Sequence, residues 1–204
     1  MLSSKGFDLW ADSYDKSVGL SDEDNTYPFA GYKALLNEIY NRVLSRAERT
    51  VLDLGFGTAT LTAKLYEQGC TVYGQDFSPR MLALAQAKMP RATLCTGDLT
   101  VGLAEPLRAA RYDAIIATYS LHHLSDEQKV GLLSTLPSLL NAGGCIYIGD
   151  VAFETREDLE RQRTLSGDEW DDEECYFVFD ELVKRLPSLT FERFSPCAGL
   201  LTLQ

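Results

Sequence analysis

Short apolar runs alternate with longer amphipathic segments between residues 50 and 150. The runs are rich in aliphatic and β-branched residues, and this composition favours strands at 50–54, 71–75, 92–95, 114–117 and 145–148. The segments between them have helical spacing, which predicts helices at 58–67, 79–88 and 126–139. The order of elements is therefore a repeated strand and helix.

Strands that are apolar throughout and separated by helices are typical of a parallel sheet covered on both faces. Outside this core, an amphipathic helix is expected over 29–44 and another over 177–186, followed by strands at 190–194 and 197–203. The sequence thus predicts a doubly wound α/β fold: a mostly parallel seven-stranded sheet with helices on both faces and a C-terminal antiparallel hairpin.

Length and composition narrow the class of protein. A chain of 204 residues with 45% hydrophobic and 24% charged residues is expected to form a single domain over 1–204. We divide it into an N-terminal lid and flanking helix (1–45), a cofactor-binding core (46–150), and an acidic segment, helix and closing hairpin (151–204). A net charge of −11 repels phosphates, which argues against nucleic acid and anionic membranes as partners.

The sequence also indicates where in the cell the protein is expected to be located. No apolar stretch is long enough for a membrane span or a signal peptide, and the five cysteines form no CxxC pair. We therefore expect free thiols, a cytoplasmic location and a small-molecule ligand. The sequence leaves the oligomeric state open.

The most specific local signal is the segment VLDLGFGTAT at 51–60, an apolar strand followed by Gly55, Gly57 and a predicted helix. Glycines at a strand-to-helix turn remove side chains that would block a ligand at the helix N-terminus. Asp76 ends the second predicted strand, 21 positions after Gly55. A carboxylate there can accept hydrogen bonds from the hydroxyls of a ribose.

Two classes of cofactor share this arrangement. A nicotinamide dinucleotide requires a small third residue in the motif GxGxxG/A, and Thr60 occupies that position. S-adenosylmethionine has no phosphate and requires only an open turn, a ribose acceptor and an adenine site. We therefore favour S-adenosylmethionine.

The segments VLDLGFGTATLT, GQDFSPRMLALA, TGDL, YDAIIATYSLHHL and LLNAGGCIYIGD occur in this order along the chain. In order and spacing they resemble the motifs of class I S-adenosylmethionine-dependent methyltransferases, which have a Rossmann-like fold. The N-terminal FDLWADSYD is similar to the opening segment of the small-molecule branch of that family. Within the branch, the chain is most similar to small bacterial methyltransferases of unassigned substrate.

The resemblance implies a role for individual residues. Asp53, Gly55 and Gly57 would surround the methionine moiety and Asp76 would bind the ribose. The remaining implied contacts are Asp98 and Leu99 to the adenine, Thr118 to the sulfonium region and Tyr14 over the methionine end.

Two positions depart from the family pattern. Ala59 stands in place of a third glycine, and Ala142 in place of a proline. An alanine at position 59 is accommodated wherever φ is negative.

The N-terminal segment 7–27 contains aromatic and acidic residues but few aliphatic ones. It has too little apolar surface to order without a partner, so we expect it to close over bound cofactor.

The two histidines of the chain, His122 and His123, are adjacent in the loop after the fourth core strand. That loop lies at the ligand-binding edge of such sheets, so either imidazole is a candidate catalytic base for a hydroxyl, amine or thiol. The alternative is a structural role, because the resemblance extends over LHHL.

Segment 154–174 holds ten acidic and three basic residues. This composition favours a mobile, solvated charged stretch, or else a cover for a cationic substrate. No spacing of histidine, cysteine and carboxylate resembles a metal motif, so we expect no metal ion.

Taken together, the sequence predicts an enzyme that transfers a methyl group from S-adenosylmethionine to an O, N or S nucleophile of a small molecule. A first alternative is a non-catalytic module that binds S-adenosylmethionine. A second, disfavoured by Thr60, is a nicotinamide-dependent oxidoreductase.

Overall fold

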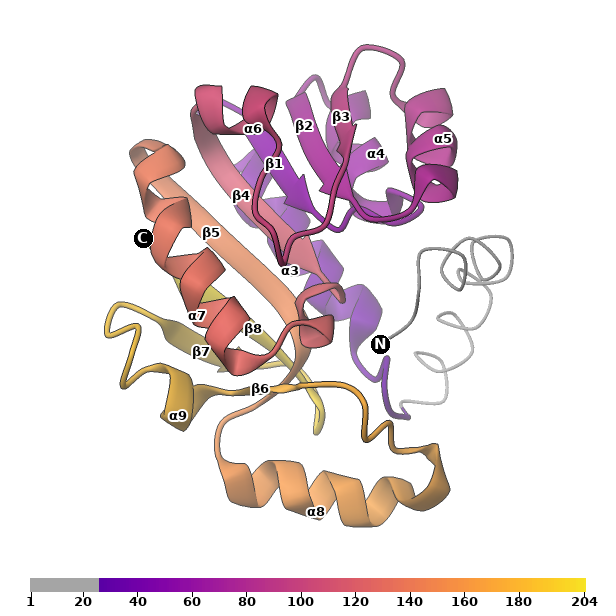
Figure 1. Cartoon of the computed structure of the whole chain (residues 1–204), viewed down its shortest axis with the longest axis vertical. Helices are drawn as coiled ribbons and strands as arrows, with labels where there is room; N and C mark the ends of the chain where they lie inside the picture. The colour runs from indigo at the N-terminus through magenta and orange to yellow at the C-terminus, as the bar shows by residue number, and fades with distance from the viewer. Residues whose placement is uncertain (1–25) are drawn as a thin grey trace.

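The computed structural model of the protein describes residues 26–204 (Figure 1). Its central sheet has the strand order β3-β2-β1-β4-β5-β8-β7. The strands of this sheet are β1 (Thr50–Leu54), β2 (Thr71–Asp76), β3 (Thr93–Thr96), β4 (Tyr112–Thr118), β5 (Leu140–Phe153), β7 (Thr190–Arg193) and β8 (Ala198–Leu203).

The pairing within the sheet confirms the predicted fold class. Strands β1 to β5 run parallel to one another, with β1 between β2 and β4. Strand β8 pairs antiparallel with both β5 and β7, which makes the predicted C-terminal hairpin part of the same sheet. A further two-residue strand, β6 (Phe177–Val178), pairs with the end of β5.

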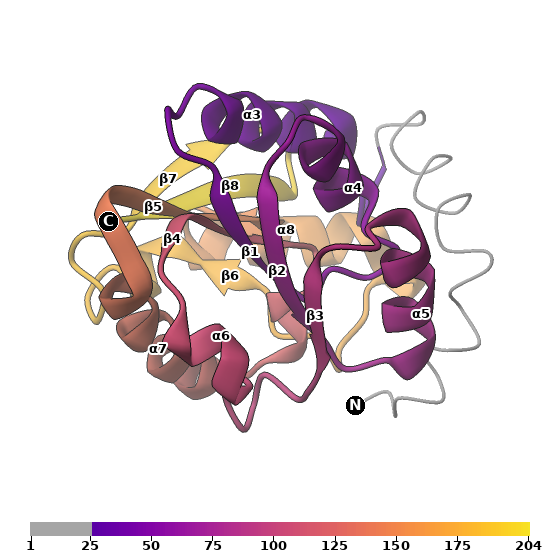
Figure 2. The ribbon, with the colours of Figure 1, turned by 90° about the horizontal axis from the view of Figure 1, so that it is seen from above.

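The helices of the described chain lie on both faces of the sheet (Figure 2). One face carries α3 (Tyr32–Leu44), α4 (Thr60–Glu67) and α5 (Pro79–Lys88), and the other carries α6 (Glu105–Ala109), α7 (Asp126–Thr135) and α9 (Phe179–Leu182). The helix α8 (Arg156–Ser166) follows β5 at one end of the molecule.

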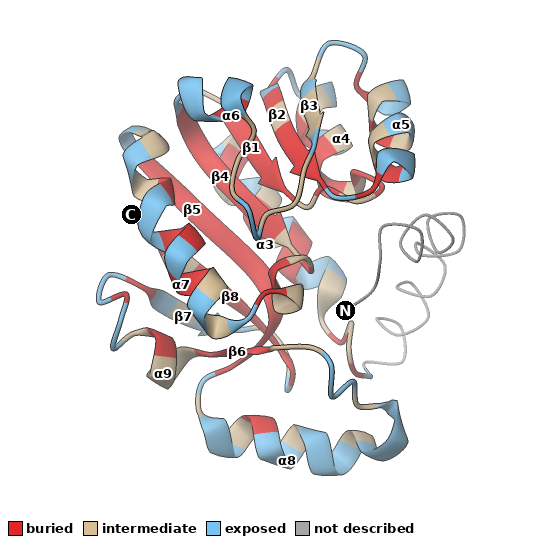
Figure 3. Ribbon diagram, viewed as in Figure 1, coloured by how far each residue is buried: buried red, intermediate tan, exposed pale blue. Residues whose placement is uncertain are grey.

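Two hydrophobic cores hold these layers together. Successive residues of a strand point to opposite faces, so Val51 packs with α3, α4 and α5, whereas Leu52 packs with α6 and α7. The central strands are buried along almost their whole length, as Figure 3 shows. This two-sided burial explains why their sequences are apolar runs without polar alternation.

Capping residues set the helix starts that the sequence indicates. The Ser78 side chain accepts a hydrogen bond from the backbone of Met81 at 3.1 Å, and Pro79 occupies the first turn of α5. Ser125 and Gln128 form a reciprocal capping box at the start of α7. The predicted helix over 126–139 continues past α7 as a 3₁₀ turn.

Two C-terminal expectations are wrong in detail. The helix predicted over 177–186 is reduced to the four residues of α9, because Phe177 and Val178 pair with β5 instead. Part of the acidic stretch is the ordered helix α8 rather than a mobile segment. Thr155 caps this helix, and Leu159 buries its apolar side chain against the core.

Among residues 26–204, no helix combines the length and the apolar character that crossing a bilayer requires.

Candidate functional site

The carboxyl ends of β1, β2 and β4 meet at one edge of the sheet, where a cavity of about 280 Å³ opens. This volume is close to the lower end of the range for ligand pockets, roughly 300–1,000 Å³. The cavity brings together every predicted site residue that the structure describes: Asp53, Gly55, Gly57, Asp76, Asp98, Leu99, Thr118, His122 and His123. The remaining predicted residue, Tyr14, lies outside the described part of the chain.

The turn after β1 depends on its two glycines. Gly55 has φ of 75°, and a Cβ there would lie 2.4 Å from the Cβ of Ser120. Ser120 is itself fixed, because its hydroxyl donates to the Leu54 carbonyl at 2.7 Å. Gly57 has φ of 53°, and a Cβ there would meet no atom within 4 Å. Gly55 therefore permits a close backbone approach, whereas Gly57 leaves space on the side of the cavity.

Ala59 departs from the conformation expected of it. Its φ is +60°, in the left-handed region, so the condition of a negative φ is not met. A left-handed backbone brings Cβ close to the following carbonyl and costs about 1–2 kcal/mol for a residue other than glycine. The position thus retains the backbone conformation that favours glycine while carrying a methyl group.

Asp76 is buried at the end of β2 and ties two segments together. Its Oδ2 accepts a hydrogen bond from the backbone N–H of Gly57 at 2.7 Å, and its Oδ1 accepts one from Ser78 at 2.9 Å. The side chain therefore fixes the glycine turn and forms part of the cavity wall.

Asp53 is the most deeply buried acid of the cavity, with 1% of its surface exposed. Its Oδ2 accepts a hydrogen bond from the Thr62 hydroxyl, whereas its Oδ1 has no hydrogen-bond partner among the described residues. Burial, reinforced by the nearby charge of Asp76, raises the pKa of Asp53 to about 7 despite the Thr62 hydrogen bond. A buried acceptor without a partner is costly, and a donor from a ligand would remove that cost.

The remaining predicted contacts lie on neighbouring loops of the cavity. Asp98 follows β3 and accepts a hydrogen bond from the Thr100 backbone at 2.8 Å. Leu99 is half-buried, and Thr118 ends β4 with its side chain partly exposed.

The histidine pair forms a single 3₁₀ turn after β4. His122 Nδ1 donates to Oδ1 of Asp150 at 2.6 Å, and His123 Nδ1 lies 2.9 Å from Oε2 of Glu174. Burial alone would lower the pKa of His122, but the buried Asp150 carboxylate outweighs it and the pKa is raised. Asp150 and Glu174 were not identified from the sequence, because they lie 28 and 51 positions from their histidines.

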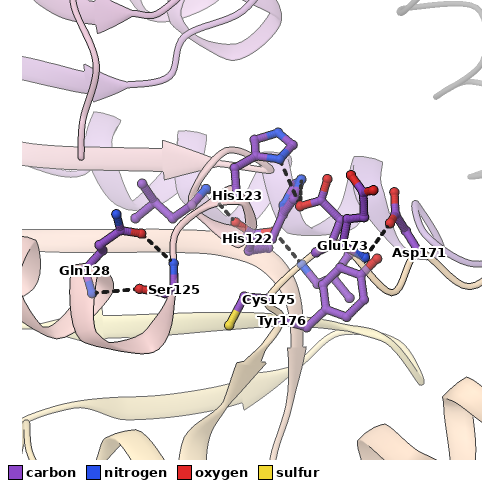
Figure 4. Close-up of polar contacts among 12 residues, drawn as sticks. His122, His123, Ser125, Gln128, Asp171, Glu173, Cys175 and Tyr176 are labelled. Atoms are coloured by element: carbon purple, nitrogen blue, oxygen red, sulfur yellow. Dashed lines mark hydrogen bonds and ion pairs between the residues drawn. The ribbon is translucent and has the colours of Figure 1, made fainter. Parts of the chain in front are cut away.

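Segment 171–176 lies beside the histidine turn and is fixed to it, as Figure 4 shows. The backbone N–H of Cys175 donates to the His122 carbonyl at 2.8 Å. The fully buried Lys129 donates to the Cys175 carbonyl and, at 3.1 Å, to Asp126. The position of Glu174 is therefore set in part by the contacts of its neighbour Cys175.

An aromatic wall, formed by Phe29, Tyr32 and Tyr119, lines another part of the cavity. The Tyr119 ring centroid lies 5.2 Å from that of Phe29 and 5.1 Å from that of Tyr32. Tyr119 has φ of +49°, an unfavourable conformation of the kind that is concentrated at functional sites. The sequence predicts a helix that contains Tyr32, but no local pattern indicates that Tyr32 and Phe29 lie beside Tyr119.

Comparison with known proteins adds independent information. A family model described as a methyltransferase domain matches residues 51–144. An uncharacterised methyltransferase of Geobacillus sp. (strain WCH70) is 40% identical over 156 residues, which cover 76% of this chain and 70% of that protein. An uncharacterised methyltransferase of Anoxybacillus flavithermus is 40% identical over 154 residues, which cover 76% of this chain and 69% of that protein.

Solved structures share the fold at lower identity. The complex of DhpI with SAH has a TM-score of 0.70 and 19% identity, and the match covers 98% of this chain and 93% of DhpI. The magnesium protoporphyrin IX methyltransferase from Synechocystis PCC 6803 with bound SAH has a TM-score of 0.65 and 21% identity, with coverage of 84% and 82%. At this level of identity, the likeness shows a common fold.

Proposed function

Because the chain belongs to the class I S-adenosylmethionine-dependent methyltransferases, we propose that its cavity holds the methyl donor and a small-molecule acceptor side by side. Family membership argues against the nicotinamide-dependent oxidoreductase. The observation that carries the assignment of the cavity is the buried Oδ1 of Asp53, which has no partner among the residues described.

The cavity fits a methionine moiety at the turn after β1. Oδ1 of Asp53 has no hydrogen-bond donor beside it among the described residues. The amino group of a bound amino acid would supply such a donor. Gly57 leaves open space on the cavity wall where any other residue would place a Cβ. We therefore assign Asp53, Gly55 and Gly57 to the methionine end of the donor.

We assign the other predicted residues to the ribose, the adenine and the sulfonium region of the donor. Asp76 accepts hydrogen bonds from two backbone N–H groups and lines the cavity, and it would accept from the ribose hydroxyls. Asp98 and the Leu99 backbone would bind the adenine amino group, on the strength of the family resemblance. Thr118 would lie near the sulfonium, and Tyr14 over the methionine end, both on the strength of the family resemblance.

When bound, S-adenosylmethionine supplies a methyl group on a positively charged sulfur. The protein then has to align an acceptor atom for in-line attack at about 3–3.5 Å and keep water out. The aromatic wall of Phe29, Tyr32 and Tyr119 offers an apolar surface for the body of the acceptor. We assign the two histidines to the acceptor side, because they follow β4 whereas the assigned ribose and adenine residues follow β2 and β3.

The proposal is tested by binding and turnover on the full chain. Calorimetry is expected to show binding of S-adenosylmethionine and S-adenosylhomocysteine, with no binding of NAD. A screen with an isotopically labelled methyl donor against a library of small metabolites, analysed by mass spectrometry, is expected to give a methylated product. NAD binding tighter than S-adenosylmethionine would contradict the assignment of the cavity, and donor binding without any turnover would favour a non-catalytic module.

A further inference from the structure

Three side chains that could bind a metal ion lie close together, and two of them, His122 and His123, line the cavity. The ligand atoms of His122, His123 and Glu174 all lie within 4.8 Å of one another. Oε2 of Glu174 is 2.9 Å from Nδ1 of His123 and 3.9 Å from Nε2 of His122. We propose that these three residues bind one divalent transition-metal ion.

The spacing of the atoms is close to that of a real site. Imidazole nitrogens and carboxylate oxygens bind zinc at about 2.0–2.2 Å, which places tetrahedral neighbours roughly 3.4 Å apart. The separations of 2.9 and 3.9 Å lie on either side of that value. The two distances to Glu174 therefore suit a shared ion, and rotation of the imidazoles, whose ligand atoms lie within 4.8 Å of each other, would complete the site.

The hydrogen bonds behind His122 prepare it as a ligand. Oδ1 of Asp150 accepts from the backbone N–H of Val151 at 2.8 Å, and Oδ2 accepts from that of Leu121 at 3.1 Å. The carboxylate therefore acts as an acceptor, and Nδ1–H of His122 donates to it at 2.6 Å. In the neutral ring, the lone pair that can bind a metal ion is then on Nε2. A carboxylate behind the coordinating imidazole is the arrangement that orients most metal-bound histidines.

The surroundings favour a cation at this point. Two carboxylates, Asp150 and Glu174, face the two imidazoles, and both are largely withdrawn from solvent. The nearby ammonium of Lys129 does not neutralise Glu174 by a direct contact, because it donates to Asp126 and to the Cys175 carbonyl. A bound ion would balance the negative charge of the cluster.

The donor set indicates the class of ion. Two imidazoles and one carboxylate suit Zn²⁺, Co²⁺, Ni²⁺ or Fe²⁺, whereas Mg²⁺ and Ca²⁺ prefer oxygen ligands alone. Three protein donors leave at least one coordination position, and both histidines line the cavity. If the proposed function holds, that position would take a lone pair of the acceptor and lower the pKa of its attacking group.

Sequence spacing alone gave no sign of this site. The expectation of no metal rested on the lack of a short motif, and the carboxylate ligand is 51 positions from His123. The fold brings Glu174 to the histidines through segment 171–176, which no local pattern indicates.

The test uses the full chain, stripped with a chelator and kept in a non-thiol reductant. Titration with Co²⁺ or Zn²⁺, followed by visible absorption and by elemental analysis after gel filtration, is expected to show one ion per chain. Glu174→Gln is expected to weaken Co²⁺ binding by more than about 100-fold, and Asp150→Asn by about 10–100-fold. Circular dichroism melts confirm that each variant is folded at the temperature of the titration.

Two variants serve as controls. Glu173→Gln removes the same charge at the adjacent position, outside the proposed ligand set, and is expected to keep the affinity within about twofold. Cys175→Ser is also expected to keep it, because the thiol belongs to no ligand group of the described chain. A cobalt spectrum with a thiolate charge-transfer band would contradict the proposed ligands.

The inference falls if the folded wild type takes up no stoichiometric ion, or if Glu174→Gln and Glu173→Gln bind Co²⁺ equally. Calorimetry with S-adenosylhomocysteine on the same preparations separates this result from the proposed function. Donor binding without metal binding would overturn only the metal site. Metal binding without donor binding would overturn only the assignment of the cavity.

Discussion

The carboxylate of Asp76 accepts a hydrogen bond at 2.7 Å from the backbone N–H of Gly57, 19 positions earlier in the chain. The residue proposed to bind the ribose therefore also holds the turn proposed to receive the methionine end. The two halves of the proposed donor site share this contact, and a change at Asp76 is expected to affect both.

Asp76→Ala should weaken S-adenosylhomocysteine binding about a hundredfold, or roughly 3 kcal/mol, because it removes the ribose acceptor and frees the glycine turn. Calorimetry measures the change in Kd. The matched control is Asp113→Ala, since Asp113 is a buried carboxylate that accepts from Thr50 and Asn141 outside the cavity. It should lower stability but leave Kd nearly unchanged; equal losses in both variants would remove Asp76 from the site.

Donor binding should release a proton from Asp53. Its pKa of about 7 in the cofactor-free protein falls once the cationic amino group of the donor lies beside it. Affinity should therefore rise between about pH 6 and 8 and level off above that. Calorimetry at pH 6.5 in two buffers of different ionisation enthalpy measures the release. Asp53→Asn should abolish the buffer dependence, and a wild type without such dependence would contradict the pairing.

The raised pKa of Asp53 also determines how the free energy of unfolding changes with pH. Between the ordinary pKa of an aspartate, near 4, and about 7, the folded chain keeps a proton that the unfolded chain has lost. The contribution of Asp53 to stability therefore falls as pH rises through this window and is constant above it. Urea unfolding of wild type and Asp53→Asn across pH 5–8 should show a decline that the variant lacks.

The two histidines should differ in their effect on folding. His122→Ala leaves the buried Asp150 without one of its donors and should cost about 2–3 kcal/mol. His123→Ala removes a partly exposed ring that pairs with Glu174 and should cost less than about 1 kcal/mol. Urea unfolding midpoints at neutral pH measure both; the reverse order would show that Asp150 does not depend on His122.

Ala59→Gly should stabilise the protein by about 0.5–1 kcal/mol. The substitution relieves a left-handed strain of about 1–2 kcal/mol, partly offset by the greater freedom of glycine in the unfolded chain. Ala63→Gly, one turn later within α4, should instead destabilise by about 1 kcal/mol. Thermal unfolding of the two variants checks the contrast, and a loss of stability at position 59 would contradict the strain.

Local patterns identify most of the core but not the polar or long-range elements. The apolar run of β4 and the capped start of α5 are recognisable because burial and capping act on neighbouring residues. Helix α8 is hard to recognise because Leu159 is its only buried side chain among charged residues. Strand β6 exists only because β5 lies beside it, and this contact has no local signature.

The candidate site divides in the same way. Gly55, Gly57 and Asp76 follow a motif with fixed spacing, so the sequence locates them on one edge of the sheet. Asp150 and Glu174 contact histidines that are 28 and 51 positions away in the chain. The sequence also does not distinguish a buried carboxylate from an exposed one. The left-handed backbone of Ala59 was missed because the residue type favours the opposite conformation.

The position of β8 bears on how the chain is made. Residues 198–203 insert between β5 and β7, although they are synthesised after both. Until they leave the ribosome, the long apolar edge of β5 has no partner along Ile146–Val151 and resembles the open edges through which chains aggregate. The growing chain thus passes through a stage in which the strands that carry the proposed donor site are complete while the edge of β5 is still open.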